Sequence, residues 1–152
     1  MRYSSKLIYT FSFLLIFSFN SFAQELHWYS WNEGYKKAKK ENKIILLDTY
    51  TEWCSWCKVM DRDTYTVKEV KDKIADDFIP IKLNPEVSGT YIYDGKEYSG
   101  KALRNKLARN KFRGYPTTFF VYPKTGGSYM EIGYIKADRF AKILGKYAAK
   151  SQ

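Results

Sequence analysis

Metal-binding residues are scarce in this sequence of 152 residues, which contains one histidine, His27, and two cysteines, Cys54 and Cys57. A zinc site needs about four ligands, so these three residues could hold zinc only if a second chain completed the site. Attachment of a c-type haem needs a histidine directly after the second cysteine, and Lys58 occupies that position. The sequence therefore predicts neither a metal nor another cofactor.

Long hydrophobic runs are also lacking. The apolar stretch LIYTFSFLLIFSF at residues 7–19 is shorter than the roughly 18 to 20 residues that span a bilayer, which argues against an uncleaved anchor. It follows a basic lead and precedes SFA, whose small residues suit a cleavage site. We predict a secretory signal peptide over residues 1–23, cleaved before Gln24, and an exported, periplasmic or otherwise secreted, domain over residues 24–152.

Acidic residues are outnumbered, because 26 lysines and arginines face 16 aspartates and glutamates and give a formal net charge of +10. Much of the excess lies in residues 35–43 and 100–113, which have the pattern of solvated helix faces. For an exported protein this charge predicts weak attraction to acidic partners or membrane surfaces, and no nucleic-acid role. The length suits one domain with a substantial core, which we expect to be a monomer.

Both cysteines lie in the segment TEWCSWCKV, residues 51–59. The pair could be a redox centre, half of a metal site or a structural disulfide. Export would allow a disulfide to persist, but a bridge from Cys54 to Cys57 closes a very short loop, which stabilises a fold least. Because metal ligands are also lacking, redox chemistry is the interpretation that remains.

The flanking segments place this pair between a strand and a helix. SWNE at residues 30–33 has the S-x-x-E pattern that begins a helix. KIILLDTY at residues 43–50 is a continuous apolar run, typical of a strand buried on both faces, and residues 54–63 suit a helix. A helix N-terminus favours a thiolate, so we expect Cys54 to be exposed for attack and Cys57, one turn further on, to lie beneath it.

Several segments together resemble the thioredoxin superfamily. LLDTYTEWCSWCK at residues 46–58 is similar to its active-site segment, in which an aspartate precedes W-C-x-x-C-K by a fixed step. IKLN at residues 81–84 resembles the next strand, and GYPTTFFVYP at residues 114–123 resembles the proline-containing segment. KTGGSYMEIGY at residues 124–134 resembles the hairpin that follows, and a helix over residues 137–149 completes the order.

The resemblance implies an α/β protein with the thioredoxin fold, a central mixed β-sheet flanked by helices. Trp56 before the second cysteine and the amphipathic helix before the first strand are similar to exported thioredoxin-like proteins akin to the C-terminal domain of thiol:disulfide interchange proteins. An additional hairpin at residues 87–100 and a helix at residues 101–112 form an insertion before the cis-proline of the fold. Tyrosines of the hairpin could bind a partner or, as we favour, cover the sheet edge.

The resemblance also implies roles for individual residues. Cys54 matches the attacking cysteine and Cys57 the resolving one. Asp48 matches the buried aspartate that accepts a proton from the second cysteine, and Lys82 matches the lysine that pairs with this aspartate. The alternatives are that Asp48 is an exposed residue at a strand end and that Lys82 lies on the surface of a strand edge.

Substrate-binding residues follow from the same likeness. Pro116 matches the family's proline, whose preceding bond is cis, and the backbone of Tyr115 would pair with an extended substrate segment. Trp53 and Trp56 would widen the apolar contact around Cys54, although ordinary packing is the alternative for both.

The predicted function is that of an exported oxidoreductase that reduces protein disulfides and is itself reduced by a membrane thiol:disulfide interchange protein. Between the cysteines stand Ser55 and Trp56, without the histidine that makes such disulfides strongly oxidising, and this favours a reductase. An oxidase or isomerase is the alternative within the same chemistry. A redox-inert module that holds a partner through the hairpin and the basic helix is the alternative in another class.

Overall fold

The buried strand expected at residues 43–50 forms the centre of a four-stranded mixed sheet with the order β2-β1-β5-β6. The computed structural model describes residues 25–151, so the predicted signal peptide at residues 1–23 lies outside the described residues. β1 runs parallel to β2 and antiparallel to β5, which is antiparallel to β6. The sheet strands are β1 (Ile44–Thr49), β2 (Phe78–Leu83), β5 (Thr117–Tyr122) and β6 (Gly127–Ile132).

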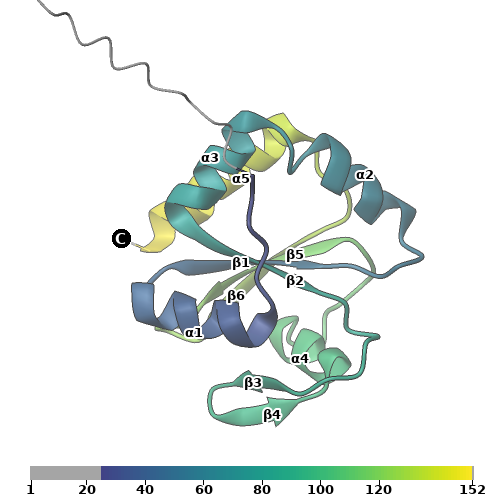
Figure 1. The fold of residues 1–152 in the computed structure, drawn as a ribbon, viewed down its shortest axis with the longest axis vertical. Coiled ribbons are helices and arrows are strands. Elements are labelled where there is room, and N and C mark those ends of the chain that lie inside the picture. Colours follow the sequence, from purple (N-terminus) through teal and green to yellow (C-terminus); the bar gives the residue numbers. More distant parts are fainter. Residues whose placement is uncertain (1–24, 152) are drawn as a thin grey trace, which may run out of the picture.

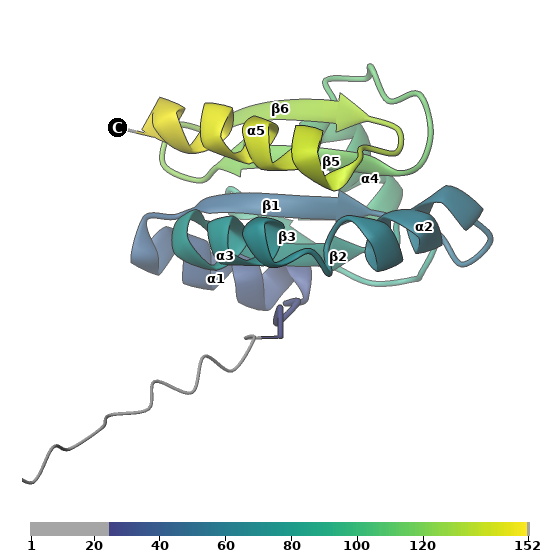
Figure 2. The same cartoon turned by 90° about the horizontal axis from the view of Figure 1, so that it is seen from above.

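Helices cover both faces of this sheet, so the fold class expected from the sequence is confirmed (Figure 1). α2, α3 and α5 lie over one face, and α1 and α4 lie over the other together with a two-stranded hairpin of β3 and β4. Seen from above in Figure 2, α3 and α5 run side by side across the sheet. The bounds are α1 (Trp31–Glu41), α2 (Ser55–Asp63), α3 (Lys68–Asp77), β3 (Tyr91–Tyr93), β4 (Lys96–Tyr98), α4 (Gly100–Leu107), α5 (Ala137–Ala148) and a final 3-10 turn (Ala149–Ser151).

Alternate residues of β1 point into two separate hydrophobic cores, as the two faces of a strand require. Ile44 and Leu46 belong to the core beneath α2, α3 and α5, whereas Ile45 and Leu47 belong to the core beneath α1 and α4. Every residue of β1 is buried, which explains why its sequence is a continuous apolar run. Asp48 follows the alternation and lies on the same face as Leu46.

The first helix begins where the sequence indicates. Ser30 is its N-cap, and the Ser30 hydroxyl donates a hydrogen bond of 2.6 Å to Glu33 Oε2. Hydrogen bonds from the side chain and backbone of Ser30 lower the pKa of Glu33, as expected for a carboxylate in the first turn of a helix. Asn42 ends the helix in a left-handed conformation, with φ 55°.

The predicted hairpin forms around Asp94 and Gly95, whose φ angles of 49° and 74° suit a tight turn between two strands. It is fastened to α1, because Trp31 Nε1 donates to the Ile92 carbonyl at 2.8 Å and the Tyr35 hydroxyl donates to Asp94 Oδ1 at 2.8 Å. Tyr93 is buried, and its ring packs against the rings of Trp31 and Tyr35 on α1. These hairpin contacts are packing, as we favoured, but against α1 rather than along the sheet edge.

Two helical segments differ from expectation. The helix expected over residues 101–112 ends at Leu107, because Arg109 and Asn110 adopt left-handed φ angles of 48° and 60° that a helix cannot accommodate. The helix α3 was not predicted at all, although its two buried residues, Val70 and Ile74, have helical spacing. No helix in the described part of the chain is long and apolar enough to cross a membrane.

Candidate active site

The two cysteines form a disulfide at the start of α2, with a Cα–Cα distance of 5.4 Å. Cys54 is the N-cap of the helix, and its Sγ accepts a hydrogen bond of 3.1 Å from the backbone N–H of Cys57. An N–H in this position would also stabilise a thiolate on Cys54 after reduction. The predicted placement of the pair after a central strand and at a helix N-terminus is confirmed.

The exposure predicted for Cys54 is wrong for this disulfide form. Cys54 is only 5% exposed and Cys57 only 3% exposed. The reason is geometric, because Sγ of Cys54 is turned back over the first helical turn, where it meets both Sγ and N–H of Cys57. The side chains that face solvent are those of Trp53, 68% exposed, and Trp56, 58% exposed.

Asp48 is buried in the centre of the sheet, which rules out the exposed strand-end alternative. Its neighbours in register are Lys82 on β2 and Thr118 on β5. Among the described residues, Asp48 Oδ1 has no hydrogen-bond partner. Burial raises the pKa of Asp48 to about 6, and the opposing charge of Lys82 only partly offsets this increase. A carboxyl group with such a pKa can both accept and release a proton near neutral pH.

Lys82 points into the space between the sheet and α2 and pairs with Asp48, with 3.4 Å between Nζ and Oδ2. It also forms a hydrogen-bonded ion pair with Asp61 on α2. Its ammonium group is surrounded by three aromatic rings whose centroids lie 5.1 to 5.9 Å from Nζ, namely Trp28, Tyr50 and Tyr65. The sequence alone did not point to Asp61, although it stands four residues after Cys57 and so lies on the same face of the helix.

The segment with Tyr115 and Pro116 reaches the cysteines through an aromatic contact. The peptide bond between these two residues is cis. The Tyr115 ring meets the ring of Trp53 edge-on, with 5.8 Å between centroids, and its hydroxyl accepts a hydrogen bond of 2.9 Å from Arg104 on α4. Trp53 Nε1 donates to Glu86 Oε2 at 3.0 Å. The inserted helix thus supports the aromatic residues on one side of the disulfide.

Trp56 lies in a different environment from Trp53. Its ring packs at 5.5 Å, centroid to centroid, from that of Tyr134, in the segment between β6 and α5. Because both tryptophans keep more than half of their surface exposed while making these contacts, the disulfide is flanked by apolar surface on two sides. The two tryptophans are therefore available to contact another molecule.

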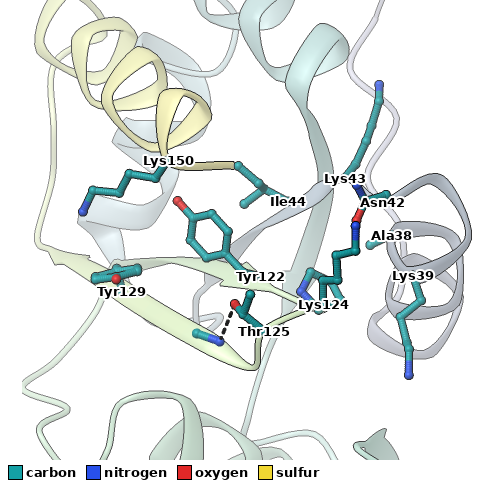
Figure 3. Close-up of a pocket in the computed structure, with 12 residues that line it drawn as sticks. Ala38, Lys39, Asn42, Lys43, Ile44, Tyr122, Lys124, Thr125, Tyr129 and Lys150 are labelled. Carbon is teal, nitrogen blue, oxygen red and sulfur yellow. Dashed lines mark hydrogen bonds between the residues drawn. The ribbon is translucent and has the colours of Figure 1, made fainter. Parts of the chain in front are cut away.

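A separate pocket of about 480 Å³ lies at the far end of the sheet, near Ile44 and Tyr122 (Figure 3). The pocket is bordered by four lysines, but Figure 3 shows the side chains of Lys39 and Lys43 directed away from it. Lys43 Nζ donates instead to the Ala75 carbonyl, at 3.2 Å. Since Ile44 and Thr49 are at opposite ends of β1, this pocket is remote from the cysteines. Within residues 25–151, no group of three or more histidine, cysteine or acidic side chains is placed to hold a metal ion.

Comparison with known proteins agrees with this geometry. Human spermatogenesis-associated protein 20 is 33% identical over 70 residues, a match that covers 43% of this chain and only 9% of that protein. A thioredoxin from Thermus thermophilus superposes with a TM-score of 0.66 at 20% identity, covering 84% of this chain and 91% of the other. The oxidised C-terminal domain of DsbD from Neisseria meningitidis superposes with a TM-score of 0.56 at 24% identity, covering 76% and 90%.

These likenesses establish the thioredoxin fold and the expected resemblance to thiol:disulfide interchange domains. The chain spans a small part of the length of its human relative, so the activity of that whole protein does not carry over. The model of the thioredoxin-like DsbH family, described as protein of unknown function DUF255, matches residues 12–146. The chain therefore belongs to this family, within the thioredoxin superfamily.

Proposed function

We propose that this protein is an exported thiol:disulfide oxidoreductase that reduces disulfide bonds in other proteins. The observation that carries the proposal is the Cys54–Cys57 disulfide at the N-terminus of α2, on the same side of the sheet as the buried carboxyl group of Asp48. A structural bridge would need neither this helix position nor a buried acid nearby. The fold and the cysteine pair together support thiol–disulfide exchange.

The reaction begins with the reduced dithiol. The Cys54 thiolate attacks one sulfur of a substrate disulfide, and the other substrate sulfur leaves as a thiolate that takes up a proton. Asp48 accepts the proton of Cys57, whose thiolate then attacks Sγ of Cys54 in the mixed disulfide. The second substrate sulfur leaves and takes up the proton held by Asp48, which returns to its ionised form, and the Cys54–Cys57 disulfide forms. Two electrons and two protons have passed from the dithiol to the substrate.

Asp48 suits this role because its pKa of about 6 is close to neutral pH. A carboxylate with an ordinary pKa near 4 would be a weaker base for a thiol of pKa about 8.5. Lys82 keeps the ionised form of Asp48 accessible by offsetting part of the cost of burial. The pair thus provides a base that is ionised at neutral pH and still has substantial proton affinity.

Substrate binding is assigned to the surface around the disulfide. Trp53 and Trp56 provide exposed apolar contact on both sides of the cysteines. The backbone of Tyr115, in the segment that contacts Trp53 and includes Pro116, would pair with an extended stretch of the substrate. An unfolded or flexible protein segment that carries a disulfide fits this surface best.

The direction of electron flow and the electron donor are part of the proposal. Ser55 and Trp56 between the cysteines provide no imidazolium to stabilise a thiolate on Cys54, which favours a reductase over an oxidase or isomerase. A protein working outside the cytoplasm needs electrons from the membrane, and a membrane thiol:disulfide interchange protein has the required chemistry. The predicted signal peptide and the similarity to a DsbD domain support this assignment.

Trapping of a reaction intermediate tests the proposal. Cys57→Ser retains the attacking sulfur and lacks the resolving one, so the reduced variant should accumulate a mixed disulfide with an oxidised, disulfide-containing protein such as insulin. Cys54→Ser is the matched control and should form no such adduct. Absence of an adduct with Cys57→Ser, together with no insulin reduction by the unaltered protein, would favour a redox-inert binding module. Tyr93 of the hairpin would contribute little to such a module, because its side chain is buried against α1.

A further inference from the structure

Lys82 lies between two carboxylates that differ sharply in their exposure. Its Nζ contacts Asp61 Oδ1 directly, whereas its distance to Asp48 Oδ2 is 3.4 Å. The side chains of Asp48, Lys82 and Asp61 are 3%, 21% and 43% exposed, so the three groups lead from the buried sheet to solvent. The nearer partner of Lys82 is the exposed one.

The path from Lys82 to solvent is open. Asp61 and Lys82 border a hollow of about 380 Å³ that is also lined by Trp28, Thr66 and Lys71. Its remaining lining residues are Glu25, Leu26 and Tyr65. Water in this hollow can reach Asp61 without entering the core. The outer end of the Asp48–Lys82–Asp61 row is therefore exposed, while its inner end is buried.

Lys82 is held in place by more than its two acids. The segment before α1 runs parallel to β2, where Tyr29 N donates to the Pro80 carbonyl at 2.9 Å and Lys82 N donates to the Tyr29 carbonyl at 3.2 Å. This pairing sets Trp28 against the Lys82 ammonium group, and Tyr50 and Tyr65 close two more sides. The ammonium group is confined to a short range between the two carboxylates. Replacing one acid should therefore change the distance between Lys82 Nζ and the other acid.

We propose that Asp61 is a positioning residue of the redox site, which draws Lys82 toward solvent and so limits how closely Lys82 pairs with Asp48. The inference rests on the function proposed above for Asp48. Nothing in the sequence motif of the cysteines requires an acid at this position. Its placement on α2, one turn beyond Cys57, connects the helix that carries the disulfide to the strand that carries Lys82.

The electrostatics of the row give the direction of the effect. Asp61 adds a negative charge that raises the pKa of Asp48, and Lys82 lowers it. The other ionisable groups around the row are Tyr50, Tyr65, Lys71 and Glu25. Removing the charge of Asp61 takes away a repulsion and frees Lys82 to approach Asp48. Both changes favour the ionised form of Asp48 and weaken it as a base for Cys57.

The test is a titration of the Asp48 carboxyl carbon by NMR in the oxidised protein and in Asp61→Asn, with Asp48→Asn used to assign the signal. The midpoint for Asp48 should fall by roughly one pH unit in Asp61→Asn. Asp61→Glu keeps the charge, so the titration midpoint of Asp48 in this variant should lie close to that in the unaltered protein. Asp63→Asn is the matched control, since it removes an acid of the same helix that pairs with Arg62, and it should leave the midpoint in place.

Two results would overturn the inference: a midpoint that does not fall in Asp61→Asn, or an equal fall in Asp63→Asn. Loss of fold is checked by the near-UV circular dichroism of Asp61→Asn, and Asp61→Glu provides the charge-retaining variant if asparagine is not tolerated. The titration needs no turnover, so an inactive protein would refute the proposed function and leave this test intact. In an active protein, the acidic limb of the pH–rate profile should shift downward together with the midpoint.

Discussion

Replacing Asp48 with asparagine should stabilise the protein at neutral pH and leave its stability in acid nearly unchanged. Burial raises the pKa of Asp48 from its ordinary 3.8 to about 6. Because this pKa is higher in the folded state than in the unfolded chain, folding is favoured when the group is protonated. This contribution to stability is fully present below about pH 4, and it is lost as the pH rises through 6.

The size of the effect follows from the two pKa values. A difference of one pH unit corresponds to about 1.4 kcal/mol, so the change from 3.8 to about 6 corresponds to about 3 kcal/mol. No discount for solvent screening is needed, because the Asp48 side chain is only 3% exposed. Asp48→Asn keeps the shape of the side chain and removes its ionisation. The free energy of unfolding of Asp48→Asn should therefore match that of the unaltered protein in strong acid. At mildly alkaline pH it should exceed that of the unaltered protein by about 3 kcal/mol, and most of this difference should develop between pH 4 and 7.

Urea unfolding of the oxidised protein, followed by tryptophan fluorescence at pH 4, 6 and 8, measures this change. Asp63→Asn is a suitable control. The guanidinium of Arg62 lowers the pKa of Asp63, so any pH-dependent difference for this variant should have the opposite sign. If the difference between Asp48→Asn and the unaltered protein were the same at pH 4 and pH 8, the assignment of a raised pKa to Asp48 would be refuted.

Three further predictions concern packing and substrate contact. Leu46→Ala should lower the free energy of unfolding by about 2 to 5 kcal/mol, because Leu46 is fully buried, and an unchanged urea midpoint would contradict this. Gly34→Ala should destabilise the protein despite a gain in helix propensity of about 1 kcal/mol, because the new Cβ would lie 2.5 Å from side-chain carbons of Ile81. An increased urea midpoint for Gly34→Ala would show that the interface can expand. Trp53→Ala and Trp56→Ala should lower kcat/KM for a protein disulfide while leaving the rate with a small aromatic disulfide nearly unchanged. Equal losses with both substrates would indicate that the tryptophans have a structural role instead.

The parts of the fold that could be predicted from the sequence are those with strong local signals. The run at residues 43–50 was recognisable because a strand buried on both faces needs apolar residues at every position. The hairpin turn was recognisable because Asp94 and Gly95 tolerate positive φ. The resemblance to thioredoxins then supplied the arrangement of these elements, which local patterns alone do not determine.

The parts that were missed depend on contacts between distant segments. The pairing of Lys82 with Asp48 was expected from the resemblance, but the contact of Lys82 with Asp61 forms only when β2 and α2 come together, and no spacing within one segment reveals it. The burial of Cys54 likewise follows from the disulfide geometry, which turns its sulfur over the helix. The early end of α4 reflects two residues in left-handed conformation, of which Arg109 is a residue type that usually continues a helix.

The reduction potential of the Cys54–Cys57 couple tests the proposed reductase most directly. The couple of the purified protein would be equilibrated with dithiothreitol or glutathione buffers, and the fraction reduced would be measured by thiol alkylation. We predict a value near about −270 mV, where thioredoxin lies. A value near about −120 mV would contradict a reductase and indicate an oxidase, and a couple that stays oxidised below about −300 mV would indicate a structural bridge.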